Sequence, residues 1–189
     1  ARKKKALFPH PGGCIIGNRP LDTHFFVLQQ LGANIKHENG AYALETEGLV
    51  GAKIVLPEFS VTATENALMA AVLAKGETII KMAAAEPHVE DLINFLIGMG
   101  AQIHGAGTHT QKIQGVAKLR GTEHTLIPDH IEIGTFAVAA AVTRGTVKIN
   151  PVVPEHLESV LALLKRIGVP HEVRGDSLTV NPYTSLKSF

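Results

Sequence analysis

The sequence lacks tryptophan and has only two tyrosines and one cysteine in 189 residues. With so few stacking aromatics and a net charge of +1, the composition argues against a nucleic-acid-binding protein. A single cysteine excludes an internal disulfide, so we expect a reducing, cytoplasmic setting. No run approaches the roughly 18 apolar residues that a membrane-spanning helix needs. The basic residues at 2–5 precede an apolar stretch too short for a signal peptide.

The composition is otherwise that of a folded protein, with 45% hydrophobic and 19% charged residues, and the length suits one ordinary domain or two small ones. A glycine recurs at residues 32, 100 and 168, a spacing of 68 residues each time. The segment before each glycine has apolar residues at helical spacing, which predicts a helix that ends at the glycine. These segments are residues 23–31, 89–99 and 157–167.

Short alternating segments predict strands between these helices. The expected strands are residues 42–44, 54–57, 78–80, 111–113, 125–128, 146–149 and 178–180. Residues 63–74 and 134–143 are rich in alanine and apolar on nearly every face, which predicts buried helices with Met69 and Phe136 in the core. The predicted unit is β-α-β-α-β-β, present twice in full and once in part.

The only cysteine lies in the segment PGGCIIGNRPLD at residues 11–22. Three glycines and two prolines there disfavour a helix or a central strand, so this segment is predicted to be a loop. Arg19, five residues after Cys14, could stabilise a thiolate or an anionic substrate. The pattern favours a reactive thiol, while a small buried hydrophobic cysteine remains the alternative.

Four motifs together resemble the UDP-N-acetylglucosamine enolpyruvyl transferases. They are PGGCxIGxRPxDxH at residues 11–24, SVTATEN at 60–66, AAEP at 84–87 and PDxIExGTF at 128–136. The resemblance extends over nearly the whole chain, and the cysteine segment separates it from the related shikimate-pathway enzymes. It implies an α/β fold: an inside-out α/β barrel of β-α-β-α-β-β units in two domains, with the active site in the cleft between them.

Members of this family are much longer, so the barrel is expected to be incomplete. By the resemblance, residues 1–127 form part of the first domain and residues 128–189 form one unit of the second. The implied reaction transfers enolpyruvyl from phosphoenolpyruvate to the 3-hydroxyl of UDP-N-acetylglucosamine and releases phosphate, the first committed step of peptidoglycan synthesis. With part of the cleft missing, we expect the chain to be weakly active or inactive alone.

The resemblance makes Cys14 the general acid that protonates phosphoenolpyruvate, and it has Asp129 orient the cationic groups of the cleft. A thiol on a glycine-rich loop also suits a cleft that closes over its substrate. Glu132 follows Asp129 by three residues on the same face of a turn and is expected at the cleft too. Without the resemblance, both carboxylates would be interpreted as solvated surface groups.

The resemblance also implies a sugar-nucleotide site. Its expected residues are Arg19, Pro20, Leu21, Asp22 and Thr23 around the uridine, Ser60, Val61 and Thr62 at the diphosphate, and Glu86. Arg19 offers paired donors for phosphate, and the first-turn amides of a helix suit a diphosphate. Asp22 and Glu86 have an alternative role as helix caps, and Arg19 as a surface cation.

Two residues depart from the family pattern: Thr62 stands where glycine is common, and Glu58 where some members have lysine. Because a carboxylate near a diphosphate is unfavourable, Glu58 is not expected to be a ligand. These departures keep open a non-catalytic sugar-nucleotide-binding or assembly domain of the same fold. The expected partners are the two small-molecule substrates, without nucleic acid, membrane, metal or cofactor. Apolar helix surface left uncovered by an incomplete barrel would favour self-association.

Overall fold

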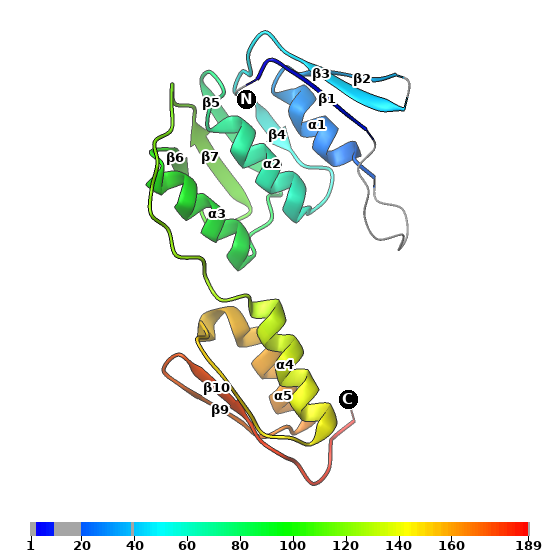
Figure 1. Ribbon diagram of the computed structural model, residues 1–189, viewed down its shortest axis with the longest axis vertical. Helices are drawn as coiled ribbons and strands as arrows, with labels where there is room; N and C mark the ends of the chain where they lie inside the picture. Colours follow the sequence, from blue (N-terminus) through cyan, green and yellow to red (C-terminus); the bar gives the residue numbers. More distant parts are fainter. Residues whose placement is uncertain (1–2, 10–19, 39, 189) are drawn as a thin grey trace. The chain divides into compact units, whose positions relative to one another are not determined.

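The computed structural model describes residues 3–9, 20–38 and 40–188, which fall into two compact units (Figure 1). The first unit spans Ala1–His124 and the second Thr125–Phe189. Each unit has its own hydrophobic core, and the two cores share no residue. That these units correspond to two domains of the family, with a boundary at residue 128, stays a prediction.

In the described residues of the first unit, three helices lie against two small sheets. Its elements are β1 (Lys5–Pro9), α1 (Asp22–Gln30), β2 (Asn34–Glu38), β3 (Ala41–Glu45), β4 (Lys53–Val55), α2 (Val61–Ala71), β5 (Glu77–Lys81), α3 (Pro87–Gly98), β6 (Gln102–His104) and β7 (Thr110–Gln114). One sheet has the antiparallel order β1-β3-β2, and the other has the order β4-β5-β7-β6, with β4 and β5 parallel. α2 contacts both α1 and α3 and lies between them (Figure 1).

Among its described residues, the second unit has two α-helices, one 3-10 helix and one antiparallel sheet in the order β8-β10-β9. Its elements are α4 (His130–Thr143), β8 (Val147–Ile149), a 3-10 helix (Pro154–Leu157), α5 (Glu158–Ile167), β9 (His171–Arg174) and β10 (Ser177–Val180). In the described part of the chain, every helix is too short or too polar to cross a membrane.

A β-α-β-β arrangement occurs three times and accounts for the spacing of 68 residues. In each copy the last strand lies in the middle, giving the orders β1-β3-β2, β5-β7-β6 and β8-β10-β9. The helices end beside Gly32, Gly100 and Gly168, whose φ angles are 92°, 99° and 83°. Because residues with a Cβ are strained in this left-handed conformation, glycine ends these helices as the sequence predicts.

The predicted six-element unit forms once in full, as β4-α2-β5-α3-β6-β7. In the second unit the expected strand at residues 125–128 is irregular instead, so the prediction of two full copies is wrong. The reason is that residues 125–128 have no partner strand among the described residues. In the first unit, β4 pairs with β5. In the second unit, β8 corresponds to β5, but it is an edge strand and no described strand pairs with its outer side. Without hydrogen bonds to a neighbouring strand, residues 125–128 do not form a strand.

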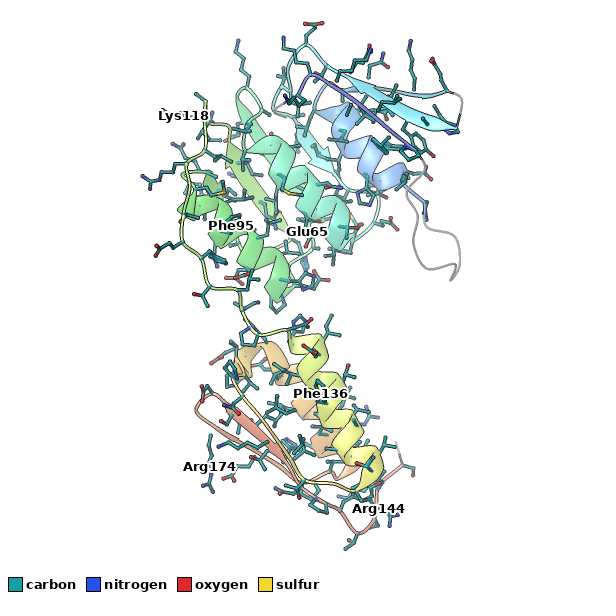
Figure 2. All side chains as sticks on the ribbon, in the orientation of Figure 1. Glu65, Phe95, Lys118, Phe136, Arg144 and Arg174 are labelled. Atoms are coloured by element: carbon teal, nitrogen blue, oxygen red, sulfur yellow. The ribbon has the colours of Figure 1, made fainter. Side chains whose placement is uncertain are left out.

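The two alanine-rich helices differ in burial. Ala67 and Leu68 of α2 are fully buried, but Met69 is 45% exposed. Phe136 of α4, labelled in Figure 2, is 53% exposed. The prediction that Met69 and Phe136 lie in the core is therefore wrong. α2 packs between two helices, while α4 contacts β8, β10 and the 3-10 helix, so most of its outer face stays exposed. An all-round apolar helix is buried only where partners cover every face.

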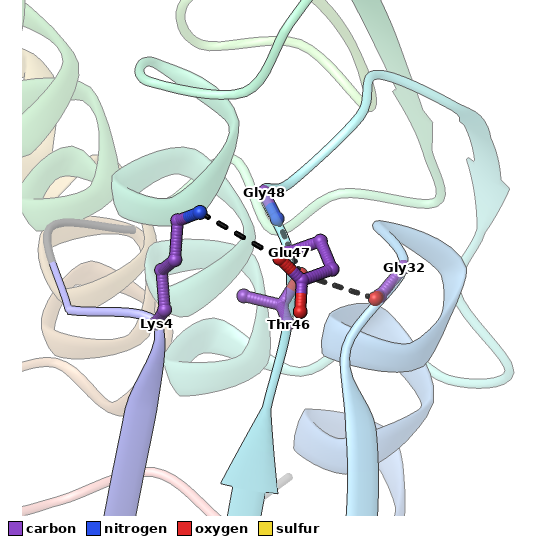
Figure 3. Close-up of polar contacts among 5 residues, drawn as sticks. All are labelled: Lys4, Gly32, Thr46, Glu47 and Gly48. Atoms are coloured by element: carbon purple, nitrogen blue, oxygen red, sulfur yellow. Dashed lines mark hydrogen bonds and ion pairs between the residues drawn. The ribbon is translucent and has the colours of Figure 1, made fainter.

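Thr46 joins the end of β3 to the end of α1 (Figure 3). Its hydroxyl donates to the carbonyl oxygen of Gly32 at 3.2 Å and accepts from the backbone N–H of Gly48 at 3.1 Å. Beside it, Lys4 Nζ lies 3.7 Å from Glu47 Oε2; both side chains are exposed, so this ion pair adds little stability. Thr46 thus connects the last strand of the first β-α-β-β copy to Gly32, the glycine that ends its helix.

Candidate functional site

The expected acid Cys14 and the expected cation Arg19 lie outside the described residues, so their roles stay predictions. Pro20 is exposed and lies two residues before the first residue of α1. Leu21 is the N-cap of α1 and makes no side-chain capping hydrogen bond. Asp22 is the first residue inside the helix, so its alternative role as the N-cap is wrong. Its carboxylate instead lies in the first turn, where the helix dipole favours negative charge.

The N-terminus of α2 is built around two hydroxyl groups. Ser60 is the N-cap, in an extended conformation, and its Oγ accepts from the backbone N–H of Ala63 at 3.4 Å. The buried Thr64 hydroxyl donates to the carbonyl oxygen of Ser60 at 2.7 Å and accepts from the N–H of Ala84 at 3.0 Å. The first turn is thereby fixed to the segment that follows β5. Its remaining amides are the kind of group that binds phosphate oxygens.

Two groups of side-chain contacts join the start of α1 to the start of α2. Thr23 Oγ1 donates to Glu58 Oε1 at 2.7 Å. The ring of His24 accepts at Nδ1 from the side-chain amide of Asn66 at 2.7 Å, and its Nε2 lies 3.4 Å from Thr62 Oγ1. We call these five residues the α1–α2 clamp. The structure therefore brings two expected parts of the sugar-nucleotide site, residues 20–23 and 60–62, next to each other.

Sequence reasoning assigned no role to His24 or Asn66, although both belong to the motifs at residues 11–24 and 60–66. The signal that could have found them is their spacing within those motifs, since His24 follows Asp22 and Asn66 lies one helical turn after Thr62. Together with Leu21, they line a pocket of about 530 Å3. Its other lining residues are Phe8, Phe25, Leu28, Leu44, Met69 and Ala70, so its remaining walls are apolar.

Glu86 lies in a second pocket of the first unit. It is the N-cap residue of α3, as its alternative role predicts, but its carboxylate makes no capping hydrogen bond. The pocket has a volume of about 400 Å3, and Glu86 shares it with Phe59, His109 and the alanines 84 and 85. The rings of Phe59 and His109 meet edge to face with centroids 4.9 Å apart. The exposed carboxylate is therefore available to a ligand.

Asp129 and Glu132 lie in the second unit, at the N-terminus of α4. Asp129 is the N-cap, and its Oδ1 accepts from the N–H of Ile131 at 2.8 Å and of Glu132 at 3.2 Å. Both carboxylates are exposed and line a pocket of about 350 Å3 within that unit. Among the residues that the structure describes, no group of three or more histidine, cysteine, aspartate or glutamate side chains is arranged to hold a metal ion.

A comparison with protein-family models matches residues 2–188 to the EPSP synthase (3-phosphoshikimate 1-carboxyvinyltransferase) family. The chain belongs to this family. Among solved structures, it resembles the enolpyruvyl transferase NikO from Streptomyces tendae, with a TM-score of 0.81 over 98% of this chain and 46% of that one, at 24% identity. EPSP synthase from Acinetobacter baumannii gives a TM-score of 0.64 over 95% of this chain and 42% of that one, also at 24% identity. These likenesses support the α/β fold expected from the resemblance.

Curated relatives are more similar in sequence. UDP-N-acetylglucosamine 1-carboxyvinyltransferase 2 of Bacillus cereus is 47% identical over 98% of this chain and 43% of its own length. UDP-N-acetylglucosamine 1-carboxyvinyltransferase of Gloeobacter violaceus is 51% identical over 96% of this chain and 40% of its own length. The resemblance to the amino-sugar branch of the family is therefore confirmed. The chain spans less than half the length of these relatives.

Proposed function

We propose that this chain takes part in the transfer of enolpyruvyl from phosphoenolpyruvate to the 3-hydroxyl of UDP-N-acetylglucosamine. The observation that carries the proposal is the identity of 47% and 51% to two curated 1-carboxyvinyltransferases of that sugar nucleotide, over nearly the whole chain. The contacts between the N-termini of α1 and α2 also support the proposal, because the motifs at residues 11–24 and 60–66 contain these N-termini.

The proposed chemistry has two steps. The 3-hydroxyl oxygen adds to C2 of phosphoenolpyruvate and loses its proton, while Cys14 donates a proton to C3, which gives a phosphorylated tetrahedral intermediate. A proton is then lost from the C3 methyl group and inorganic phosphate leaves C2, which forms the enolpyruvyl ether. Of the two protons released, one from the hydroxyl group and one from C3, one restores the Cys14 thiol and the other leaves with phosphate. Cys14 is the proposed general acid, and Asp129, with Glu132 beside it on α4, would orient the cationic groups that stabilise the intermediate.

The sugar nucleotide is proposed to bind across the starts of α1 and α2. Residues 20–23, with Arg19, would contact the uridine, and the backbone amides of residues 60–62 would contact the diphosphate. Glu86 would contact the nucleotide from its own pocket. Helix N-termini concentrate unpaired N–H groups, so this arrangement suits a ligand with two phosphate groups in its middle.

The test is phosphate release by this chain from phosphoenolpyruvate, with and without UDP-N-acetylglucosamine. Because part of the cleft is missing, we expect at most weak release, which depends on the sugar nucleotide and disappears in Cys14→Ser. Intact mass after incubation with the epoxide fosfomycin reports on the same site, and we expect one adduct on Cys14 that the sugar nucleotide promotes. Binding of the sugar nucleotide without phosphate release or adduct would contradict catalysis and favour a non-catalytic sugar-nucleotide-binding domain.

The proposal includes a cytoplasmic setting and a part in peptidoglycan synthesis, and with it cell shape and cell division. It also includes self-association of this chain. Ile131, Phe136 and Val142 of α4 are 62%, 53% and 75% exposed. An apolar groove of about 710 Å3 runs between α4 and α5, with Val138 and Leu163 among its lining residues. Apolar surface gathered in this way supports contact with a second copy.

A further inference from the structure

Glu58 and Asn66 lie outside the expected ligand set, yet each holds a residue at the start of α1. Glu58 accepts a hydrogen bond from Thr23, 35 residues away in the chain, and Asn66 donates one to His24, 42 residues away. Both bonds are 2.7 Å long. These long-range contacts fix the end of the cysteine-containing segment against α2.

The contact between Thr23 and Glu58 is specific in direction. Thr23 is only 8% exposed, and its hydroxyl is directed at a carboxylate in the loop between β4 and α2. Hydrogen bonds to an ionised acceptor are shorter and stronger than neutral ones. Glu58 precedes the N-cap Ser60 by two residues. The carboxylate therefore sets the distance between residues 20–23 and the first turn of α2.

The contact between His24 and Asn66 fixes the orientation of the imidazole. The side-chain amide nitrogen of Asn66 lies 2.7 Å from Nδ1, and Thr62 Oγ1 lies 3.4 Å from Nε2, so each ring nitrogen has a partner on α2. Thr62 and Asn66 are four residues apart, so the ring spans one turn of α2. His24 and Asn66 also line the pocket of about 530 Å3 beside α1.

We propose that Glu58 and Asn66 are positioning residues for the sugar nucleotide, which they do not contact themselves. Through Thr23 and His24, they hold residues 20–23 at a fixed place relative to the amides of residues 60–62. A ligand with a base at one end and a diphosphate next to it can then bind residues 20–23 and the amides of residues 60–62 at once. Because these segments are already ordered, binding loses less conformational entropy. This inference rests on the proposed function.

Glu58 has two opposing effects, and substitutions separate them. Its charge repels a diphosphate, whereas its hydrogen bond holds Thr23. Glu58→Gln keeps an acceptor without the charge, and we expect it to bind UDP-N-acetylglucosamine as tightly as the wild type or more tightly. Glu58→Ala loses both the charge and the acceptor, and we expect roughly tenfold weaker binding by titration calorimetry because residues 20–23 are no longer held. Asn66→Ala should weaken binding by a similar factor.

Glu65 supplies a matched control on the same helix (Figure 2). It is one residue from Asn66 but is not part of the clamp. Glu65→Gln and Glu65→Ala remove the same charge, so their affinities for the sugar nucleotide should agree within about twofold. Of these two positions, only residue 58 is expected to show a large difference in affinity between its glutamine and alanine variants.

Hydrogen exchange without ligand supplies a readout that does not depend on binding. We expect faster exchange at the amides of residues 24–26 in Glu58→Ala than in Glu58→Gln, with the amides of α3 unchanged in both. Equal affinities of the two variants, or equal exchange, would overturn the positioning role while leaving the proposed function standing. Failure of the folded wild-type chain to bind the sugar nucleotide would instead overturn the proposed function, and the inference with it.

Discussion

At the N-terminus of α2, the hydrogen bonds of a single residue fix the position of the helix's first turn. Thr64 is fully buried, and its hydroxyl accepts from the N–H of Ala84 while donating to the carbonyl oxygen of Ser60. The sequence places Thr64 inside a motif, but its partner Ala84 is 20 residues away and belongs to the segment after β5. The local sequence pattern predicts where the helix starts. Which backbone N–H donates to the buried Thr64 hydroxyl depends instead on how distant segments of the chain pack together.

Replacing Thr64 by valine keeps the shape and removes the hydroxyl. We expect Thr64→Val to lower the free energy of unfolding by about 1–3 kcal/mol, because the buried N–H of Ala84 loses its acceptor. Thr64→Ser keeps that acceptor and should cost about 1 kcal/mol for the lost methyl group. Urea unfolding followed by circular dichroism measures both. A valine variant as stable as the serine variant would show that water replaces the hydroxyl.

Among the elements, the alanine-rich helix α2 shows how burial depends on neighbours. The pattern of residues 63–74 correctly predicts a helix and its tight packing, but not which side of it remains open. Leu68 is fully buried in the core of the first unit, whereas Met69, the next residue, is 45% exposed. Periodicity cannot separate the two positions because both are apolar, so only the placement of the neighbouring helices does.

Adjacent substitutions on α2 test this difference. We expect Leu68→Ala to lower the free energy of unfolding by about 2–5 kcal/mol, since it leaves a cavity in the core of the first unit. Met69→Ala should change it by no more than about 0.5 kcal/mol, since an exposed side chain loses few contacts. Thermal or urea unfolding of both variants gives the comparison. Equal losses would mean that Met69 is covered in solution.

At the scale of the whole molecule, the chain forms two units with separate cores. The core of the second unit is the smaller, and α4 leaves much of its apolar surface exposed. A helix that is apolar on nearly every face is unfavourable in water unless something covers it. The exposed face of α4 is therefore the place where self-association is proposed.

Light scattering tests self-association directly. We expect the average mass of the chain to rise with concentration, and to rise less in Phe136→Ser and Val142→Ser, which remove apolar area from the exposed face of α4. Leu7→Ser is the control, because Leu7 is 71% exposed but lies on β1 in the first unit. A mass independent of concentration, or equal effects of all three variants, would contradict a contact through α4.

The sequence by itself determined the repeat, the helices with their glycine stops, the family, and the list of residues expected at the site. These follow from local physics: glycine at Gly32, Gly100 and Gly168 permits a backbone conformation that other residues resist, and motif spacing lies within one segment. Only the tertiary structure decided that residues 125–128 form no strand, that Phe136 is exposed, and that Glu58 and Asn66 hold α1. Each of these depends on a partner distant in the chain, which periodicity does not encode.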